Sequence, residues 1–176
     1  MNILSLHAEY NQPSGLTIQI GAAVFTVNGV LLEQFETYVN PGEPIAPFIT
    51  KLTGITDQNV QGAPSIKEAY EMLEYIHAKH KCFKNPIVWG SGVRNDSQII
   101  HQESGVERDN FMGYRVIDAK SIFQSTQMIQ GKLVRGGLEK TCKHLGIGFE
   151  GKAHTALADA MNTFRVWHYL VKRFQK

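Results

Sequence analysis

The first forty residues contain a pattern that restricts the chain to folds built on an antiparallel sheet. Residues 18–24 alternate Ile18, Ile20, Ala22 and Val24 with Gln19, Gly21 and Ala23, and a period of two is typical of a β-strand. Asn28-Gly29 follows, a pair that favours a tight hairpin turn, and residues 30–39 predict a returning strand. With a buried strand predicted at residues 3–6, the chain begins as a three-stranded antiparallel unit.

The rest of the chain alternates helices with short strands. Ser65 and Glu68 form a capping box, which predicts a helix start. Further helices are predicted as two short pieces between residues 47 and 60, from Asp96 to about Glu103, over 138–145, and from 157 to Phe174, and strands at 86–90 and 114–117. This order predicts an α/β fold with a mixed five-stranded sheet. The length of 176 residues predicts a single domain, residues 1–176.

Composition narrows the function only slightly. Charged residues make up 19% of the chain and the net charge is +2, a balance that permits a nucleic-acid enzyme without indicating one. Cys82 and Cys142 fit no metal-binding spacing, and two isolated thiols are typical of a reducing compartment. No signal peptide is visible, and no apolar stretch approaches the roughly 20 residues that span a bilayer. We therefore expect a cytoplasmic protein without a membrane partner.

Carboxylates and imidazoles recur at four places that the predicted fold could bring together. His7-Ala8-Glu9 follows the first apolar run, Asp96 follows the run Trp89-Gly90-Ser91-Gly92, and His154 and Asp159 stand five residues apart. Residues 7 and 9 of one strand share a face, so both side chains can approach the same ion. Carboxylates bind hard cations such as Mg²⁺ and can bridge two of them.

In their order and spacing these segments resemble the DEDDh 3′→5′ exonucleases, the DnaQ-like and RNase T-like branch of the RNase H-like fold. The resemblance covers roughly residues 3 to 170. It implies that Glu9, Asp96 and Asp159 hold two Mg²⁺ or Mn²⁺ ions and that His154 is the general base for the attacking water. It also implies that the substrates are 3′ ends of single-stranded DNA or RNA, which are cut to nucleoside 5′-monophosphates. Some relatives of this compact size form dimers, so a homodimer is one expected assembly.

The spacing of His154 and Asp159 affects how they can act together. Two helical residues five apart would point about 140° away from each other. We therefore expect His154 to precede the helix and Asp159 to project from its second turn. A neutral imidazole with an ordinary pKa near 6.5 suits a general base. The alternative for His154 is an exposed side chain beside a helix cap, and for Asp96 a plain helix N-cap.

Position 7 departs from the resembled family, whose first motif is Asp-x-Glu. Histidine adds no negative charge when it binds a metal, and it prefers softer ions than Mg²⁺. We expect His7 to occupy the remaining ligand position and to impair the reaction. The sequence leaves four interpretations open: an inactivating substitution, a natural variant that works with one metal or with Mn²⁺, a non-catalytic module that binds 3′ ends, or a His7 that turns away to bond the backbone. A proofreading or processing subunit of a larger complex is a further candidate function.

Other residues are candidates for substrate contacts. The stretch Leu52-Thr53-Gly54-Ile55-Thr56 resembles the segment that holds the 3′-terminal nucleoside, so Leu52 and Ile55 are predicted to pack on a base, or alternatively to anchor a turn in the core. Tyr10 is predicted either to stack on a base or to pack in the core. A sparse basic stretch could contact phosphates or form a solvated helix face; it comprises Lys132, Arg135, Lys140, Lys143 and Lys152.

Overall fold

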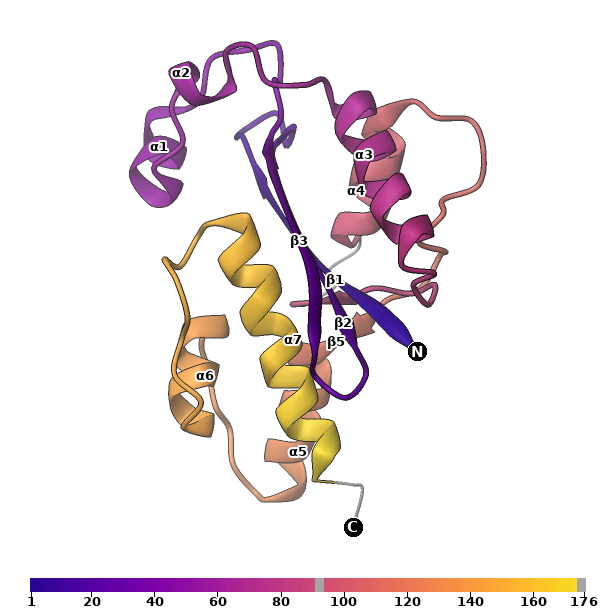
Figure 1. Ribbon diagram of the computed structural model, residues 1–176. Helices are drawn as coiled ribbons and strands as arrows, with labels where there is room; N and C mark the ends of the chain where they lie inside the picture. Colours follow the sequence, from indigo (N-terminus) through magenta and orange to yellow (C-terminus); the bar gives the residue numbers. More distant parts are fainter. Residues whose placement is uncertain (91–93, 174–176) are drawn as a thin grey trace.

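The computed structural model describes residues 1–90 and 94–173, and it contains a mixed five-stranded sheet between helices (Figure 1). The strand order is β3-β2-β1-β4-β5. The first three strands pair antiparallel, whereas β4 pairs parallel with β1 and with β5. The strands are β1 (Asn2–Tyr10), β2 (Thr17–Thr26), β3 (Leu31–Tyr38), β4 (Ile87–Val88) and β5 (Ile117–Asp118). The predicted α/β fold with a mixed five-stranded sheet is confirmed.

The first strand is longer than the apolar run alone predicts. It continues through His7 and Glu9 to Tyr10, because the backbone of each residue pairs with β2: His7 lies opposite Gly21 and Glu9 opposite Gln19. Side chains of a strand alternate between its two faces. His7 and Glu9 therefore share one face of the sheet, as predicted.

Helices cover both faces of this sheet (Figure 1). On one face, Leu4 and Leu6 of β1 pack in a buried cluster with Tyr70; on the other, Ile3 packs in a cluster with Phe164. The first face carries α3 (Ile66–Lys79) and α4 (Asp96–Ser104), and the second carries α5 (Ala119–Ile129) and α7 (Ala156–Lys172), with α6 (Leu138–Leu145) beside α7. Two short helices lie beyond the end of β3, α1 (Pro47–Thr53) and α2 (Asp57–Val60).

Several predicted boundaries differ from the structure. The fifth strand is Ile117–Asp118 rather than 114–117, and Tyr114 is exposed. The helix at 119–129 was not predicted; it begins where the Asp118 side chain accepts hydrogen bonds from the main-chain N–H groups of Lys120 and Ser121. The predicted capping box of Ser65 and Glu68 is present. Ser91, Gly92 and Phe174 lie outside the described residues. No described helix has the length and apolar character needed to cross a bilayer.

Candidate active site

The N-terminus of α7 packs against β2 at Gly21, next to His7 on the neighbouring strand. A Cβ atom on Gly21 would lie 2.1 Å from main-chain atoms of Ala156 and Leu157, so only glycine permits this approach of helix to strand. Gly21 is paired with His7 across β1 and β2. The contact therefore brings the first turn of α7, which carries Asp159, next to the side chain of His7. The prediction that Asp159 projects from the second turn is wrong.

Side chains from the sheet hold the first turn of α7 in place. Its N-cap residue, Thr155, makes no side-chain capping bond. Instead the Ala156 N–H donates to Gln19 Oε1 at 3.1 Å and the Leu157 N–H donates to Glu36 Oε1 at 3.3 Å. Gln19 also donates to Glu36 at 3.2 Å. Two main-chain donors at the helix start are thus satisfied by β2 and β3, which fixes the position of α7 on the sheet.

Three side chains from β1 and α7 form a potential cation site. His7 Nε2 lies 3.6 Å from Glu9 Oε1 and 3.6 Å from Asp159 Oδ2, and ligand atoms of all three residues lie within 4.8 Å of one another. Two of the buried atoms, His7 Nδ1 and Glu9 Oε1, have no hydrogen-bond partner among the described residues. Buried polar atoms are nearly always bonded in proteins, so the Glu9 oxygen, which lies on the Nε2 side of His7, points to a missing ligand, whereas His7 Nδ1 faces Asp96 Oδ2 at 3.3 Å. His7 does not turn away from the site.

Asp96 adds a third carboxylate to the site. It lies near His7 Nδ1, whereas Glu9 and Asp159 lie near His7 Nε2. Asn95, not Asp96, caps α4, because the Asn95 side chain accepts from the Gln98 N–H at 3.1 Å. The alternative that Asp96 is a plain N-cap is therefore wrong. Its Oδ2 accepts a hydrogen bond from the Ala8 N–H at 3.3 Å and lies 3.3 Å from His7 Nδ1.

Tyr10 contacts Asp96 rather than standing free for a base. Its hydroxyl donates to Asp96 Oδ1 at 2.8 Å, and its ring packs against the core cluster of β1 and α3. Burial and the charge of Asp96 both raise the pKa of the Tyr10 hydroxyl, so it remains a donor. Of the two predictions for Tyr10, the structure supports packing in the core, with the added role of orienting Asp96.

The surrounding carboxylates control the protonation of His7. Burial lowers the pKa of its imidazole, but Asp96 and Glu9 outweigh that effect and raise the pKa to about 10. Burial raises the pKa of Asp159, and the opposing influence of His7 does not cancel this shift. In the metal-free protein at neutral pH, His7 is therefore a cation that partly neutralises the acidic residues around it.

His154 stands outside α7, as predicted from its spacing to Asp159. Its backbone has a φ of 64°, a left-handed conformation that is uncommon for residues other than glycine and often marks a functional position. It lines a cleft of about 430 Å³ together with His7 and Asp159. The walls also contain Lys140, a predicted candidate for phosphate contact, and residues that the sequence did not indicate, among them Leu138, Phe149 and Ala153.

The two predicted base-contacting residues of the α1 segment differ in exposure. Ile55 is 3% exposed and packs with Ile18, Ile45 and Val60. Its prediction as a base contact is corrected: Ile55 is a core anchor, because the turn after α1 folds its side chain inward. Leu52 is 51% exposed and stays available to a ligand.

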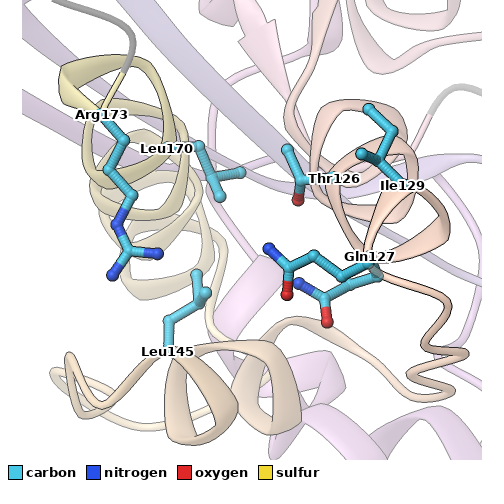
Figure 2. Close-up of a pocket in the computed structure, with 7 residues that line it drawn as sticks. Thr126, Gln127, Ile129, Leu145, Leu170 and Arg173 are labelled. Carbon is cyan, nitrogen blue, oxygen red and sulfur yellow. The ribbon is translucent and has the colours of Figure 1, made fainter. Parts of the chain in front are cut away.

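A separate cavity of about 230 Å³ lies between α5, α6 and α7 (Figure 2). Its walls include Thr126, Gln127, Leu145, Leu170 and Arg173, and none of the described residues that line it carries a carboxylate. This cavity lacks the ligands of a hard cation, so the cleft that holds His7 and Asp159 is the candidate for chemistry.

Comparisons with known proteins indicate the family of the chain. Residues 9–167 match the family RNase_T, described as Exonuclease; the match includes Glu9, Asp96, His154 and Asp159 but begins after His7. The DNA polymerase III PolC-type of Streptococcus thermophilus (strain ATCC BAA-491 / LMD-9) is 29% identical over 156 residues, which are 88% of this chain and 10% of the polymerase. The chain thus corresponds to a small part of that relative.

Two solved structures share the fold. Cell-death related nuclease 4 superposes with a TM-score of 0.82 at 17% identity, over 98% of this chain and 64% of the nuclease. The nuclease domain of 3′hExo, a DEDDh family member bound to rAMP, has a TM-score of 0.76 at 16% identity, over 98% of this chain and 92% of that domain. These likenesses confirm the RNase H-like exonuclease fold. Because the family match extends over most of its length, the chain belongs to the RNase_T exonuclease family.

Proposed function

We propose that this protein is a metal-dependent 3′–5′ exonuclease that acts on single-stranded DNA or RNA and whose activity is limited by His7. The observation that carries the proposal is the convergence of ligand atoms of Glu9, Asp159 and His7 within 4.8 Å of one another. His7 and Asp159 line a cleft that His154 also lines. Membership of an exonuclease family supports the same reaction.

The donor set suits one divalent cation better than two. Glu9, Asp159 and His7 would hold the ion, and the unpartnered Glu9 oxygen supports that fit. An imidazole among carboxylates favours Mn²⁺ over Mg²⁺. Asp96 is not in this three-residue group, and both its oxygens already accept hydrogen bonds. When bound, the ion supplies Lewis-acid stabilisation of charge on the reacting phosphate.

Each side chain near the ion would then have its own role in the hydrolysis. His154 would accept a proton from water as the water oxygen forms a bond to the terminal phosphorus. The bond from phosphorus to the 3′ oxygen of the preceding nucleotide breaks, and that oxygen takes a proton from solvent. Asp96, oriented by Tyr10 and the Ala8 N–H, would hold His7 in position. The products are a nucleoside 5′-monophosphate and a strand shorter by one nucleotide.

His7 would slow this reaction through charge. An aspartate at this position would contribute a further negative charge and could bridge two ions, whereas imidazole contributes neither. The protonated form of His7 also competes with the cation for Glu9 and Asp159, from which it lies 3.6 Å. We therefore expect His7→Asp to increase Mg²⁺-dependent activity by orders of magnitude.

A gel assay on 5′-labelled single-stranded DNA and RNA tests the proposal. The original chain and His7→Asp would be compared in Mg²⁺ and in Mn²⁺, with Glu9→Gln in each background as the control that removes a ligand. We expect a ladder that shortens from the 3′ end, strong in the Asp variant and weak in the original chain, with more product in Mn²⁺ for the latter. Equal rates for both chains would refute the role given to His7, and the absence of a ladder from either would refute the exonuclease.

A module that binds 3′ ends without cutting them is the second candidate. The observation in its favour is the cationic His7 among three acidic residues, which reduces their repulsion of a phosphate without any metal. The similarity to PolC-type polymerases makes proofreading beside a polymerase a related possibility. Retained oligonucleotide binding with no ladder from either chain would favour this module.

A further inference from the structure

A second hollow adjoins the active-site cleft along helix α6. It has a volume of about 920 Å³ and is lined by Val134, Glu139, Lys140, Lys143, His144, Gly146, Gly148 and Phe149. Glu139, Lys140 and Phe149 also line the cleft that contains His7, His154 and Asp159. The two hollows therefore share a wall, and we call the second one the α6 groove.

The α6 groove carries an excess of positive charge. Leu138 and Cys142 turn the apolar side of α6 into the core, which leaves Lys140 and Lys143 exposed on its other side. Residues 130–148 contain four lysines and arginines and one acidic residue, Glu139, whereas the whole chain has a net charge of only +2. Within residues 1–90 and 94–173, Lys140 and Lys143 have no ion-pair partner. Their charges are available to a ligand.

An aromatic ring accompanies the lysines. Phe149 is half-buried and lies in the wall common to the groove and the cleft. Proteins that bind single strands combine a basic groove, which follows the phosphates, with aromatic side chains on which bases stack. Lysine contacts to phosphates provide affinity without selecting a sequence.

We propose that the α6 groove holds the single strand that leads into the active site, with Lys140 and Lys143 on its phosphates and Phe149 against a base. This inference rests on the proposed exonuclease function, because the cleft must receive the 3′ end for the groove to receive the nucleotides before it. A nucleic-acid strand fits better than an acidic peptide, since the groove opens beside the residues that would cut a phosphodiester. Of the two interpretations of the basic stretch, phosphate contact or a solvated helix face, the proposal adopts phosphate contact for Lys140 and Lys143.

Binding measured as a function of salt tests the groove. Fluorescence anisotropy would follow 5′-fluorescein single strands of two and of twelve nucleotides, with phosphorothioate linkages to resist hydrolysis and Ca²⁺ as the cation. The test variant is Lys140→Gln with Lys143→Gln; Lys67→Gln with Lys84→Gln removes the same charge from exposed positions outside the groove. Lys140→Arg with Lys143→Arg keeps the charge. Thermal unfolding would verify that all four proteins are folded.

We expect the slope of log affinity against log salt for the twelve-nucleotide strand to decrease by about 1.4 in the test variant, because each phosphate contact on a single strand contributes about 0.7. The control pair and the arginine pair should retain the original slope. The dinucleotide occupies only the cleft, which Lys140 lines and Lys143 does not, so the test variant should lose less affinity for it than for the twelve-nucleotide strand.

Three outcomes would refute the proposal that the α6 groove holds the single strand. An unchanged slope in the test variant would exclude it as the path of the strand, even if the gel assay detects exonuclease activity. An equal loss of dinucleotide affinity would place the lysines at the terminal nucleotide instead. Binding of a polyglutamate probe in preference to both oligonucleotides would assign the groove to an acidic protein partner. The gel assay tests the exonuclease function independently, because removal of the 3′-terminal nucleotide does not require Lys143 to bind the strand.

Discussion

At the scale of single residues, His7 alters the charge of the site more than its shape. Its side chain lies on the face of β1 that also carries Glu9, within 3.6 Å of carboxylate oxygens of three residues. Because Asp96 and Glu9 raise its pKa to about 10 against the effect of burial, the metal-free protein holds a proton at this position. A histidine must lose that proton before it can bind a cation. Cation binding and proton release are therefore coupled through one side chain.

This coupling predicts a pH-dependent affinity for Mn²⁺. Below the His7 pKa of about 10, one proton leaves for each ion bound, so the apparent affinity should increase about tenfold per pH unit from pH 7 to 9. His7→Asp has no such proton to release and should bind with nearly constant affinity over that range. Isothermal titration calorimetry at several pH values measures both proteins. A flat profile for the original chain would show that His7 is not a ligand.

At the scale of elements, the site depends on how closely α7 approaches β2. Gly21 provides the space, because a side chain there would overlap the main chain of Ala156. The same helix start donates hydrogen bonds to Gln19 and Glu36. Asp159 lies in this same first turn of α7, so a displacement of the helix would separate it from Glu9 and His7.

Replacement of Gly21 by alanine tests this dependence. The added methyl group must push α7 away from the sheet, and overpacking of this kind costs about 1–3 kcal/mol of unfolding free energy. Gly137→Ala controls for the loss of a glycine without a clash, since a Cβ there meets nothing within 4 Å, and its own cost is limited to replacing the N-cap of α6. Urea unfolding would compare the two variants, and Mn²⁺ titration of Gly21→Ala should show weaker binding. If Gly21→Ala is as stable as Gly137→Ala and binds Mn²⁺ normally, α7 does not require this close approach.

The elements that the sequence predicts well are those with local signals. The alternation in β2, the Asn28-Gly29 turn and the capping box at Ser65 each act over a few residues, and each reappears in the structure. Helix α5 was missed because its start depends on the Asp118 side chain after a two-residue strand, too short to show a period. The glycine in the apolar β2 pattern could have indicated a close backbone approach.

The sequence predicted which residues form the candidate site, but not the hydrogen bonds and packing contacts that hold them there. Glu9, Asp96, His154 and Asp159 stand in recognisable motifs, and the structure brings them around His7. The hydrogen bond from Tyr10 to Asp96 and the contact of Gly21 with Ala156 join residues 86 and 135 positions apart in the sequence. Such pairs depend on the order of strands in the sheet, which no local pattern encodes. Ile55 shows the same limit, since only the folded turn directs it into the core.

At the scale of the whole molecule, one cation would join distant parts of the chain. Glu9 and His7 come from the first strand and Asp159 from the last helix, so an ion bound by all three links the two ends of the fold. A ligand that binds only the folded state stabilises it according to its concentration relative to its Kd. Asp96, from α4 in the middle of the chain, lies outside the three-residue group.

Thermal unfolding with and without Mn²⁺ therefore tests which residues hold the bound ion. At a concentration of 100 times Kd, the ion should stabilise the original chain by about 2.7 kcal/mol, seen as a higher unfolding midpoint than in EDTA. Glu9→Gln and Asp159→Asn each remove a ligand and should abolish most of this increase. Asp96→Asn should retain it, because the Asp96 oxygens are already bonded to Tyr10 and Ala8. Loss of the increase in Asp96→Asn to the same extent as in Glu9→Gln would mean that the bound ion also uses Asp96, and that the site assembles a wider set of ligands from all three elements.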